Sequence, residues 1–492
     1  MILTRPKMSY QQEKTKTFEI GSVITSFHGN TRYLQVPTRE GDSDWKRYAL
    51  KVEIPSDARK LELYLGLEGV SGTAKFRNIR FSEPKPQIDH SRSIITGELD
   101  RSNAVSYKPG EPMKFRFRIL QSGKPIGGRL RVIVAGDDGS RREDEYDLSA
   151  DRPLELTASL NQPGFVMAEA KLIDDYGNEI RRKHGNGMKA VQFGLAAGVQ
   201  PEKLTQTVAE PVDFDKFWES AAAELKAAPL RVLERKLFKT TQNSHIYDVK
   251  LSAPGPRPTV GSLAIPKDAQ KKSLPLHIQF DGYGVRDIVA QDEPGKIVFF
   301  VGPHGVDLHR EPAFYDKLFN GELYGYGFDD RQNENPHDCY FKYMILRDLR
   351  AVQYAMTLPE WDGRNLTIAG GSQGAFQAAA VTALTPEATR CELEIPWFCE
   401  LGGITAGRIR GWRPNWKKGL GYYDTVNFAR RIKCPVQIEA GLSDWVCPPS
   451  GVWCLYNVLP GSKRMKMFQG RNHGPYFGYD QKKAPFVEIN QQ

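Results

Sequence analysis

Apolar and polar residues alternate with a period of two in short runs over roughly the first two hundred positions. Examples are RYALKVEI (47–54), KLELYLGLEG (60–69), MKFRFRIL (113–120) and RLRVIVAG (129–136). Such alternation buries one face of each strand and exposes the other, which is typical of antiparallel sheets. The pattern predicts two all-β modules, over residues 1–86 and 87–200, and the turns of the second favour an immunoglobulin-like sandwich.

The pattern changes near residue 201. An amphipathic helix-forming run, DFDKFWESAAAELKAA (213–228), is followed by short apolar runs: LHIQF (276–280), IVFFV (297–301), LTIAG (366–370) and VQIEAGL (436–442). Strands that alternate with helices predict a mainly parallel, doubly wound α/β sheet over residues 201–492. Ligands of such sheets bind beyond the carboxyl ends of the strands.

The amino-acid composition argues against two classes of binding partner, membranes and nucleic acids. Hydrophobic residues make up 40% of the 492 residues and charged residues 26%, as in ordinary globular proteins. No run approaches the ~20 apolar residues of a membrane-spanning helix, so we expect no membrane partner. The net charge is +9, but basic and acidic residues are interspersed, and we expect no nucleic-acid partner.

Cysteine spacing and the first residues bear on metal sites and on localisation. None of the six cysteines forms a C-x-x-C pair, and their apolar surroundings favour buried free thiols. The first residues, MILTRPK, lack the apolar core of a signal peptide. Localisation stays open: secreted or periplasmic if a targeting segment is missing from the start, otherwise cytoplasmic.

One motif carries chemistry. GGSQG (370–374) stands between an apolar strand and an alanine-rich helix, where a nucleophile elbow would present Ser372 to a substrate. The alternative is plain packing, because glycines end strands and serines cap helices. The helix that follows would place a partial positive charge beside a developing oxyanion.

A nucleophilic serine needs a base and an acid, which follow it in the order Asp or Glu, then His, in α/β-hydrolases. Of nine histidines, His473 alone lies after Ser372. Among the acidic residues between them, Asp444 directly follows the strand VQIEAGL, at the sheet edge expected to face Ser372. Asp424 precedes a helical run and is typical of a helix cap. We therefore predict Asp444 as the acid and His473 as the base.

Two backbone N–H groups should stabilise the oxyanion. Gln373 follows the nucleophile and supplies one of them. The second is expected from the loop after an earlier strand, and FDGYG (280–284) makes Tyr283 the candidate. A plain β-turn is the alternative at this position.

These stretches resemble the acetyl xylan esterase / cephalosporin C deacetylase family, carbohydrate esterase family 7, over about residues 205–480. The resemblance rests on PVDFDKFWESAAAEL, FDGYG, GGSQG, GLSDWVCPPS and the later histidine. It implies an α/β-hydrolase with Ser372, Asp444 and His473 as triad, Tyr283 and Gln373 as oxyanion donors, and no metal or organic cofactor. It further implies acetylated carbohydrate as the substrate, and a homo-oligomer because the family forms hexameric rings.

Three places depart from the family's usual residues: F-H-G-Y reads FDGY (280–283), R-G-Q-G reads GPHG (302–305), and the catalytic histidine precedes Gly474 instead of Glu. The stretch from Asp44 to Glu83 resembles half of a carbohydrate-binding jelly roll, where Trp45 and Tyr64 are sugar-stacking candidates and core packing is the alternative.

The leading hypothesis is a serine esterase that removes O-acetyl groups from xylan, xylo-oligosaccharides or related sugars through an acyl-enzyme. One alternative is an esterase for a bulkier acyl or uronoyl ester, since the departures surround the site. The other is a non-catalytic carbohydrate-binding protein on a hydrolase fold. The space beside Ser372 would separate small from bulky acyl groups.

Overall fold

A computed structural model describes residues 17–26, 31–35, 58–68, 89–185 and 187–491. Within the predicted N-terminal module it gives one antiparallel sheet of order β2-β1-β3, formed by β1 (Thr17–Ser26), β2 (Thr31–Gln35) and β3 (Ala58–Glu68). The jelly-roll interpretation of residues 1–86 rests largely on positions outside the described residues, Trp45 included, and stays a prediction.

The next module consists of two antiparallel sheets around one apolar core. One sheet has the order β13-β10-β7-β8, and the other joins β4, β5 and β6, with β9 paired to β5. The alternation in β5 is visible in the burial of Met113, Phe115, Phe117 and Ile119. Two antiparallel sheets are what the period-two runs predict, while the immunoglobulin-like assignment stays an interpretation. We call this module the sandwich. Its strands are β4 (Ser93–Leu99), β5 (Met113–Gln121), β6 (Lys124–Ile126), β7 (Gly128–Gly136), β8 (Arg141–Leu148), β9 (Leu154–Ala158), β10 (Gly164–Ile173) and β13 (Gln192–Val199), and β11 (Arg181–His184) pairs with β12 (Gly187–Ala190) beside it.

The C-terminal part is an α/β domain built on a ten-stranded mixed sheet of order β14-β15-β16-β18-β17-β19-β20-β21-β22-β23. The central strands β18, β17, β19, β20, β21 and β22 are parallel, and antiparallel strands extend both edges. The strands are β14 (Val232–Thr240), β15 (Ser244–Leu251), β16 (Thr259–Pro266), β17 (Leu274–Phe280), β18 (Ile297–Gly302), β19 (Trp361–Gly371), β20 (Arg390–Glu394), β21 (Val436–Gly441), β22 (Lys463–Phe468) and β23 (Phe486–Gln491).

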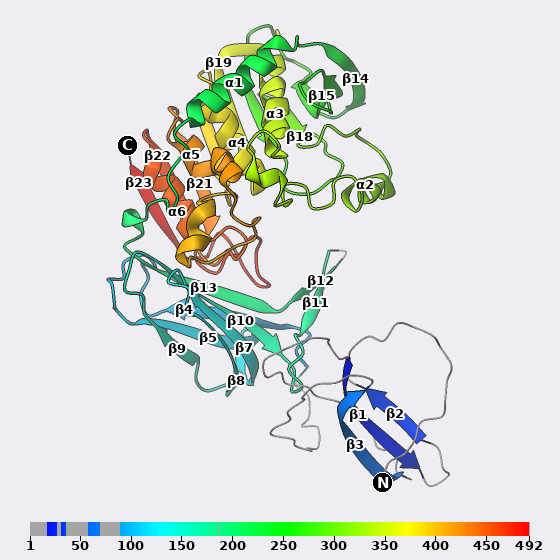
Figure 1. The fold of residues 1–492 in the computed structure, drawn as a ribbon, viewed down its shortest axis with the longest axis vertical. Helices are drawn as coiled ribbons and strands as arrows, with labels where there is room; N and C mark the ends of the chain where they lie inside the picture. Colours follow the sequence, from blue (N-terminus) through cyan, green and yellow to red (C-terminus); the bar gives the residue numbers. More distant parts are fainter. Residues whose placement is uncertain (1–16, 27–30, 36–57, 69–88, 186, 492) are drawn as a thin grey trace.

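Helices α1, α3 and α4 lie side by side along this sheet (Figure 1). The amphipathic run that begins near residue 213 forms α1, which buries Phe214, Phe217 and Trp218. The helices are α1 (Phe214–Ala227), α2 (Pro312–Phe319), α3 (Phe341–Ala355), α4 (Gln373–Ala383), α5 (Thr425–Ala429) and α6 (Pro449–Val458). None of the helices in the described ranges is long and apolar enough to cross a membrane.

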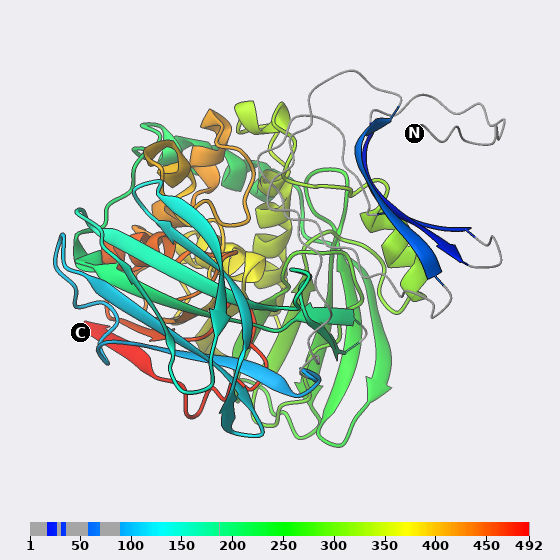
Figure 2. The same cartoon turned by 90° about the horizontal axis from the view of Figure 1, so that it is seen from below.

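The sandwich and the α/β domain share a core. Strand β10 is buried on both faces: Val166 and Ala168 belong to the sandwich core, whereas Phe165 and Met167 belong to the core of the α/β domain. Viewed from below, the cyan strands of the sandwich cross the near face of the α/β domain (Figure 2). The sandwich therefore covers an apolar face next to the loops that follow β21 and β22.

Candidate active site

Ser372 occupies the turn between β19 and α4 in a conformation that side-chain-bearing residues rarely adopt. Its φ is +56° and its ψ is −120°, and its N–H donates to the carbonyl oxygen of Glu394 at 2.9 Å. A Cβ at Gly370 would lie 2.1 Å from the carbonyl oxygen of Gly374, so only glycine fits there. The strained turn with glycines on both sides is the geometry that a nucleophile elbow requires.

The structure brings Ser372, His473 and Asp444 into one hydrogen-bonded chain. The Nε2 atom of His473 lies 2.9 Å from Oγ of Ser372, and its Nδ1 lies 3.0 Å from Oδ2 of Asp444. His473 follows β22 and Asp444 follows β21, so the ends of adjacent parallel strands position both groups. A carboxylate that accepts Nδ1–H leaves Nε2 free to accept the serine proton.

Asp444 is completely buried and its second oxygen is occupied. Oδ1 accepts the N–H groups of Val446 at 2.8 Å and Cys447 at 2.9 Å, which hold the carboxyl group in place. The His473 side chain is 29% exposed, so the imidazole reaches both the buried acid and solvent. The arrangement suits a base that must exchange a proton with a substrate.

Asn472 connects the loop after β22, which carries His473, to the loop after β21, which carries Asp444. Its Oδ1 accepts the N–H of His473 at 2.7 Å and the N–H of Trp445 at 3.1 Å. Asn472 was not predicted from the sequence. An asparagine next to the candidate histidine was the available signal, but its partner Trp445 is distant in sequence.

Asp424, the alternative acid, serves the backbone. Its carboxylate accepts the N–H groups of Glu400 (2.9 Å), Leu401 (2.7 Å) and Val426 (3.0 Å), the last as the N-cap of α5. Burial raises the pKa of Asp424 to about 6. Because both of its oxygens accept backbone N–H groups, this carboxylate is not positioned to accept a hydrogen bond from an imidazole.

The two predicted oxyanion donors lie on segments that pack directly against each other. A Cβ on Gly374 would lie 2.3 Å from the carbonyl oxygen of Phe280, so the start of α4 touches the end of β17. Likewise, a Cβ on Gly282 would lie 3.6 Å from the carbonyl oxygen of Gly371. Within the described ranges, the N–H groups of Tyr283 and Gln373 have no acceptor, so both remain available to a ligand.

Asp444, Cys447 and His473 also offer three atoms within 4.8 Å of one another, a spacing that a metal ion could use. Both imidazole nitrogens, however, are already engaged by Ser372 and Asp444. Burial and the nearby Asp444 raise the pKa of the Cys447 thiol well above its ordinary value, which disfavours the thiolate that binds metals. The geometry therefore fits a hydrogen-bonded triad better than a metal centre.

All six cysteines are buried free thiols, as their surroundings predict.

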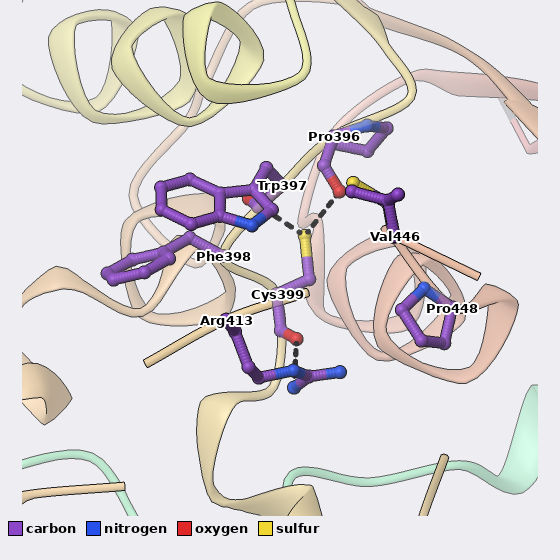
Figure 3. Close-up of a pocket in the computed structure, with 8 residues that line it drawn as sticks. Pro396, Trp397, Phe398, Cys399, Arg413, Val446 and Pro448 are labelled. Carbon is purple, nitrogen blue, oxygen red and sulfur yellow. Dashed lines mark hydrogen bonds between the residues drawn. The ribbon is translucent and has the colours of Figure 1, made fainter. Parts of the chain in front are cut away.

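A cavity of about 10 Å³ lies behind the acid loop (Figure 3). The Sγ atom of Cys399 in its wall donates to the carbonyl oxygens of Pro396 and Trp397, and Arg413 donates to the carbonyl oxygen of Cys399. The space holds about one water molecule, so it is too small for an acyl group. Its lining consists of Pro396, Trp397, Phe398, Cys399, Arg413, Val446, Cys447 and Pro448.

A family profile and a curated relative match this chain. The profile of the family described as acetyl xylan esterase (AXE1) matches residues 202–406 and 415–489. The chain is 28% identical over 384 residues to the acetyl esterase Axe7A of Xylanibacter ruminicola, covering 73% of this chain and 82% of that protein.

Two solved structures are also similar. The acetyl xylan esterase 1 of Thermoanaerobacterium sp. JW/SL YS485 is 24% identical with a TM-score of 0.47, covering 57% of this chain and 94% of that one. The acetyl xylan esterase of Paenibacillus sp. R4 is 22% identical with a TM-score of 0.45, covering 56% and 93%.

Proposed function

This chain belongs to the acetyl xylan esterase (AXE1) family, and from that premise we propose that it removes O-acetyl groups from xylan, xylo-oligosaccharides or related acetylated sugars by serine catalysis. Family membership makes the chain a carboxylic ester hydrolase, so the non-catalytic hypothesis is set aside. The observation that carries the proposal is the hydrogen-bonded chain from Asp444 through His473 to Ser372.

In the proposed first step, Oγ of Ser372 attacks the carbonyl carbon of the ester while Nε2 of His473 takes the hydroxyl proton. Asp444 accepts Nδ1–H, holds the imidazole in the required tautomer and stabilises the imidazolium. The tetrahedral intermediate then breaks its bond to the sugar oxygen, and His473 protonates that oxygen as the sugar leaves.

In the second step, a water molecule takes the place of the serine hydroxyl as the nucleophile. His473 removes a proton from a water molecule, whose oxygen attacks the acyl-enzyme carbonyl, and the proton returns to Ser372 as acetate departs. In both steps the negative oxygen would accept hydrogen bonds from the N–H groups of Tyr283 and Gln373. The partial positive charge at the N-terminus of α4 also stabilises the negative oxygen.

The test is Ser372→Ala, assayed on p-nitrophenyl acetate and on acetylated xylo-oligosaccharides. Loss of a triad nucleophile costs on the order of 10⁶ in kcat in well-studied enzymes, and we expect a loss of that order on both substrates. The matched control is Ser273→Ala: Ser273 is exposed and lies just before β17 at the opposite end of the sheet, and among the described residues its hydroxyl bonds only the backbone of Gln270. A Ser372→Ala protein with a tenth of wild-type activity would refute the assignment.

A further inference from the structure

The hydroxyl of Tyr326 lies between the two segments that carry the proposed oxyanion donors. It accepts the N–H of Gly284, the residue after Tyr283, at 2.9 Å, and it donates to the side-chain oxygen of Gln373 at 2.9 Å. Tyr326 is 5% exposed; its bond to Gln373 is buried and its bond to Gly284 is partly buried. One buried hydroxyl thus joins the loop after β17 to the first residue of α4.

The Tyr326 ring and its neighbours hold the loop from several sides. The ring stacks on that of Tyr283, with centroids 4.3 Å apart and planes 14° apart. His304 packs edge-on against Tyr326, and its Nε2 lies 3.1 Å from the carbonyl oxygen of Gly284. Burial lowers the pKa of His304 to about 3, so the imidazole is neutral. A neutral ring with Nε2–H donates to Gly284 and accepts the hydroxyl of Tyr340 at Nδ1, 2.7 Å away.

The Gln373 side chain, which accepts the Tyr326 hydroxyl, is also held in place by hydrogen bonds. Nε2 of Gln373 donates to Gln377 at 3.1 Å, and Nε2 of Gln377 donates to Asp348 at 3.0 Å. All three side chains are buried. The Gln373 side chain therefore cannot turn to replace Tyr326 with another donor without breaking a buried network.

We propose that Tyr326 is a positioning residue that sets the relative placement of the two oxyanion donors, an inference that rests on the proposed function. Tyr326 acts through Tyr283 and Gln373 and does not itself contact the reacting atoms. Oxyanion stabilisation depends on donors that are held in place before the charge develops. Removal of the hydroxyl would leave the buried amide oxygen of Gln373 and the partly buried N–H of Gly284 without partners, and the loop would shift to satisfy them.

The test compares Tyr326→Phe, which keeps the stacked ring, with wild type. We expect kcat on p-nitrophenyl acetate to fall about 10–100-fold with KM changed less than about twofold, as for a small displacement of catalytic groups. The affinity for a boronic acid that forms a tetrahedral anion on Ser372 should fall by the same factor. The control is Tyr315→Phe: Tyr315 is also 5% exposed, and its hydroxyl bonds Asp287 and the carbonyl of Asp307. We expect this control to lower Tm without changing boronate affinity.

A second variant tests the hydrogen bond between the Tyr326 hydroxyl and the Gln373 side chain. Gln373→Met removes the side-chain acceptor and keeps the backbone N–H, so its effect and that of Tyr326→Phe should not add in the double variant. Additive losses, or unchanged kcat and boronate affinity in Tyr326→Phe, would overturn the inference. If Ser372→Ala is inactive while Tyr326→Phe behaves as wild type, only the positioning role fails. If Ser372→Ala stays active, the proposed function fails first.

Discussion

Asp424 and Asp444 are both buried carboxylates after Ser372, and their hydrogen-bond partners separate their roles. Asp444 bonds the imidazole of His473, whereas Asp424, within the part of the chain that the structure describes, accepts only backbone N–H groups. The same side chain thus serves chemistry in one loop and the folding of a helix end in the other.

The Asp444→Asn variant should lose kcat with little change in KM. An asparagine that donates to Nδ1 holds the imidazole in the wrong tautomer, which costs about 10⁴ in a comparable triad. Steady-state kinetics on p-nitrophenyl acetate measures the loss. The control is Asp424→Asn, whose amide nitrogen cannot accept the N–H that one carboxylate oxygen accepts. It should lower Tm, with a loss of about 1 kcal/mol or more in the free energy of unfolding, and keep kcat per folded molecule. The opposite ranking of the two kcat values would mean that Asp424 is the acid.

At the scale of elements, the elbow depends on how closely α4 approaches the end of β17. Gly374 faces the carbonyl oxygens of Phe280 and Asp281, so any side chain there pushes the oxyanion loop away. We expect Gly374→Ala to lower both Tm and kcat, the latter at least 10-fold, because a misplacement of about 1 Å can cost 10²-fold in rate. Gly187→Ala is the control, since a Cβ on Gly187 meets nothing within 4 Å. Wild-type kcat in Gly374→Ala would show that the loop tolerates the displacement.

One of the three departures from the family pattern lies in the loop after β17, and a second departure contacts that loop. Asp281, where the family has histidine, forms a two-point ion pair with Arg286 at 2.7 and 2.9 Å, and His304 bonds the loop at Gly284. Asp281 and His304 therefore brace the loop that carries Tyr283.

A braced loop should keep the acyl site small. We expect kcat/KM to fall from acetyl to butyryl to octanoyl esters of p-nitrophenol. Each methylene that fits would gain about 0.8 kcal/mol, so a decline requires steric rejection. A rate that stays level or rises with chain length would favour the bulkier-ester hypothesis over deacetylation.

At the scale of the whole molecule, the sandwich supports the loops of the triad. Ser443, next to Asp444, donates to the carbonyl oxygen of Gly194 at 2.9 Å. Glu169 on β10 lies within 3.5 Å of Asn472 and 3.4 Å of the Tyr476 hydroxyl, on either side of His473. A carboxyl group of one module thus contacts the histidine loop of the other.

Glu169 makes this contact sensitive to pH. Burial raises its pKa from 4.5 to about 7. Because the folded-state pKa is the higher one, its stabilisation is fully present below about pH 4.5 and is lost as pH rises through about 7. The loss amounts to about 3 kcal/mol at about 1.4 kcal/mol per pKa unit.

Glu169→Gln cannot ionise, so the Tm of the variant minus that of wild type should rise between pH 5 and 8. Thermal unfolding over that range measures the difference, and constant effects of the substitution cancel. Glu179→Gln is the control: the pKa of Glu179 is lowered, so its contribution does not change over this range. A flat difference for Glu169→Gln would show that Glu169 is ionised at the interface.

Several features could be predicted from the sequence because they depend on neighbours along the chain. Alternation at period two predicts the buried positions Met113, Phe115 and Phe117 of β5, and strand–helix alternation predicts the α/β domain. The elbow around Ser372 is a five-residue pattern. Asp444 was selected because it follows an apolar strand, and His473 because no other histidine follows Ser372 in the sequence. Parallel strands bring their carboxyl ends to one edge of the sheet.

Other features depend on contacts between distant residues, which leave no local pattern. Tyr326 and Gln373 are 47 positions apart, and nothing in either segment indicates that one hydroxyl joins them. All five candidate groups follow residue 201, which by sequence alone predicts that the preceding modules are dispensable for chemistry. This stays a prediction, to which the packing adds that β10 shares the α/β core and that Glu169 contacts the loop that carries His473. Burial and hydrogen bonding between segments are set by tertiary packing, and only the folded chain decides them.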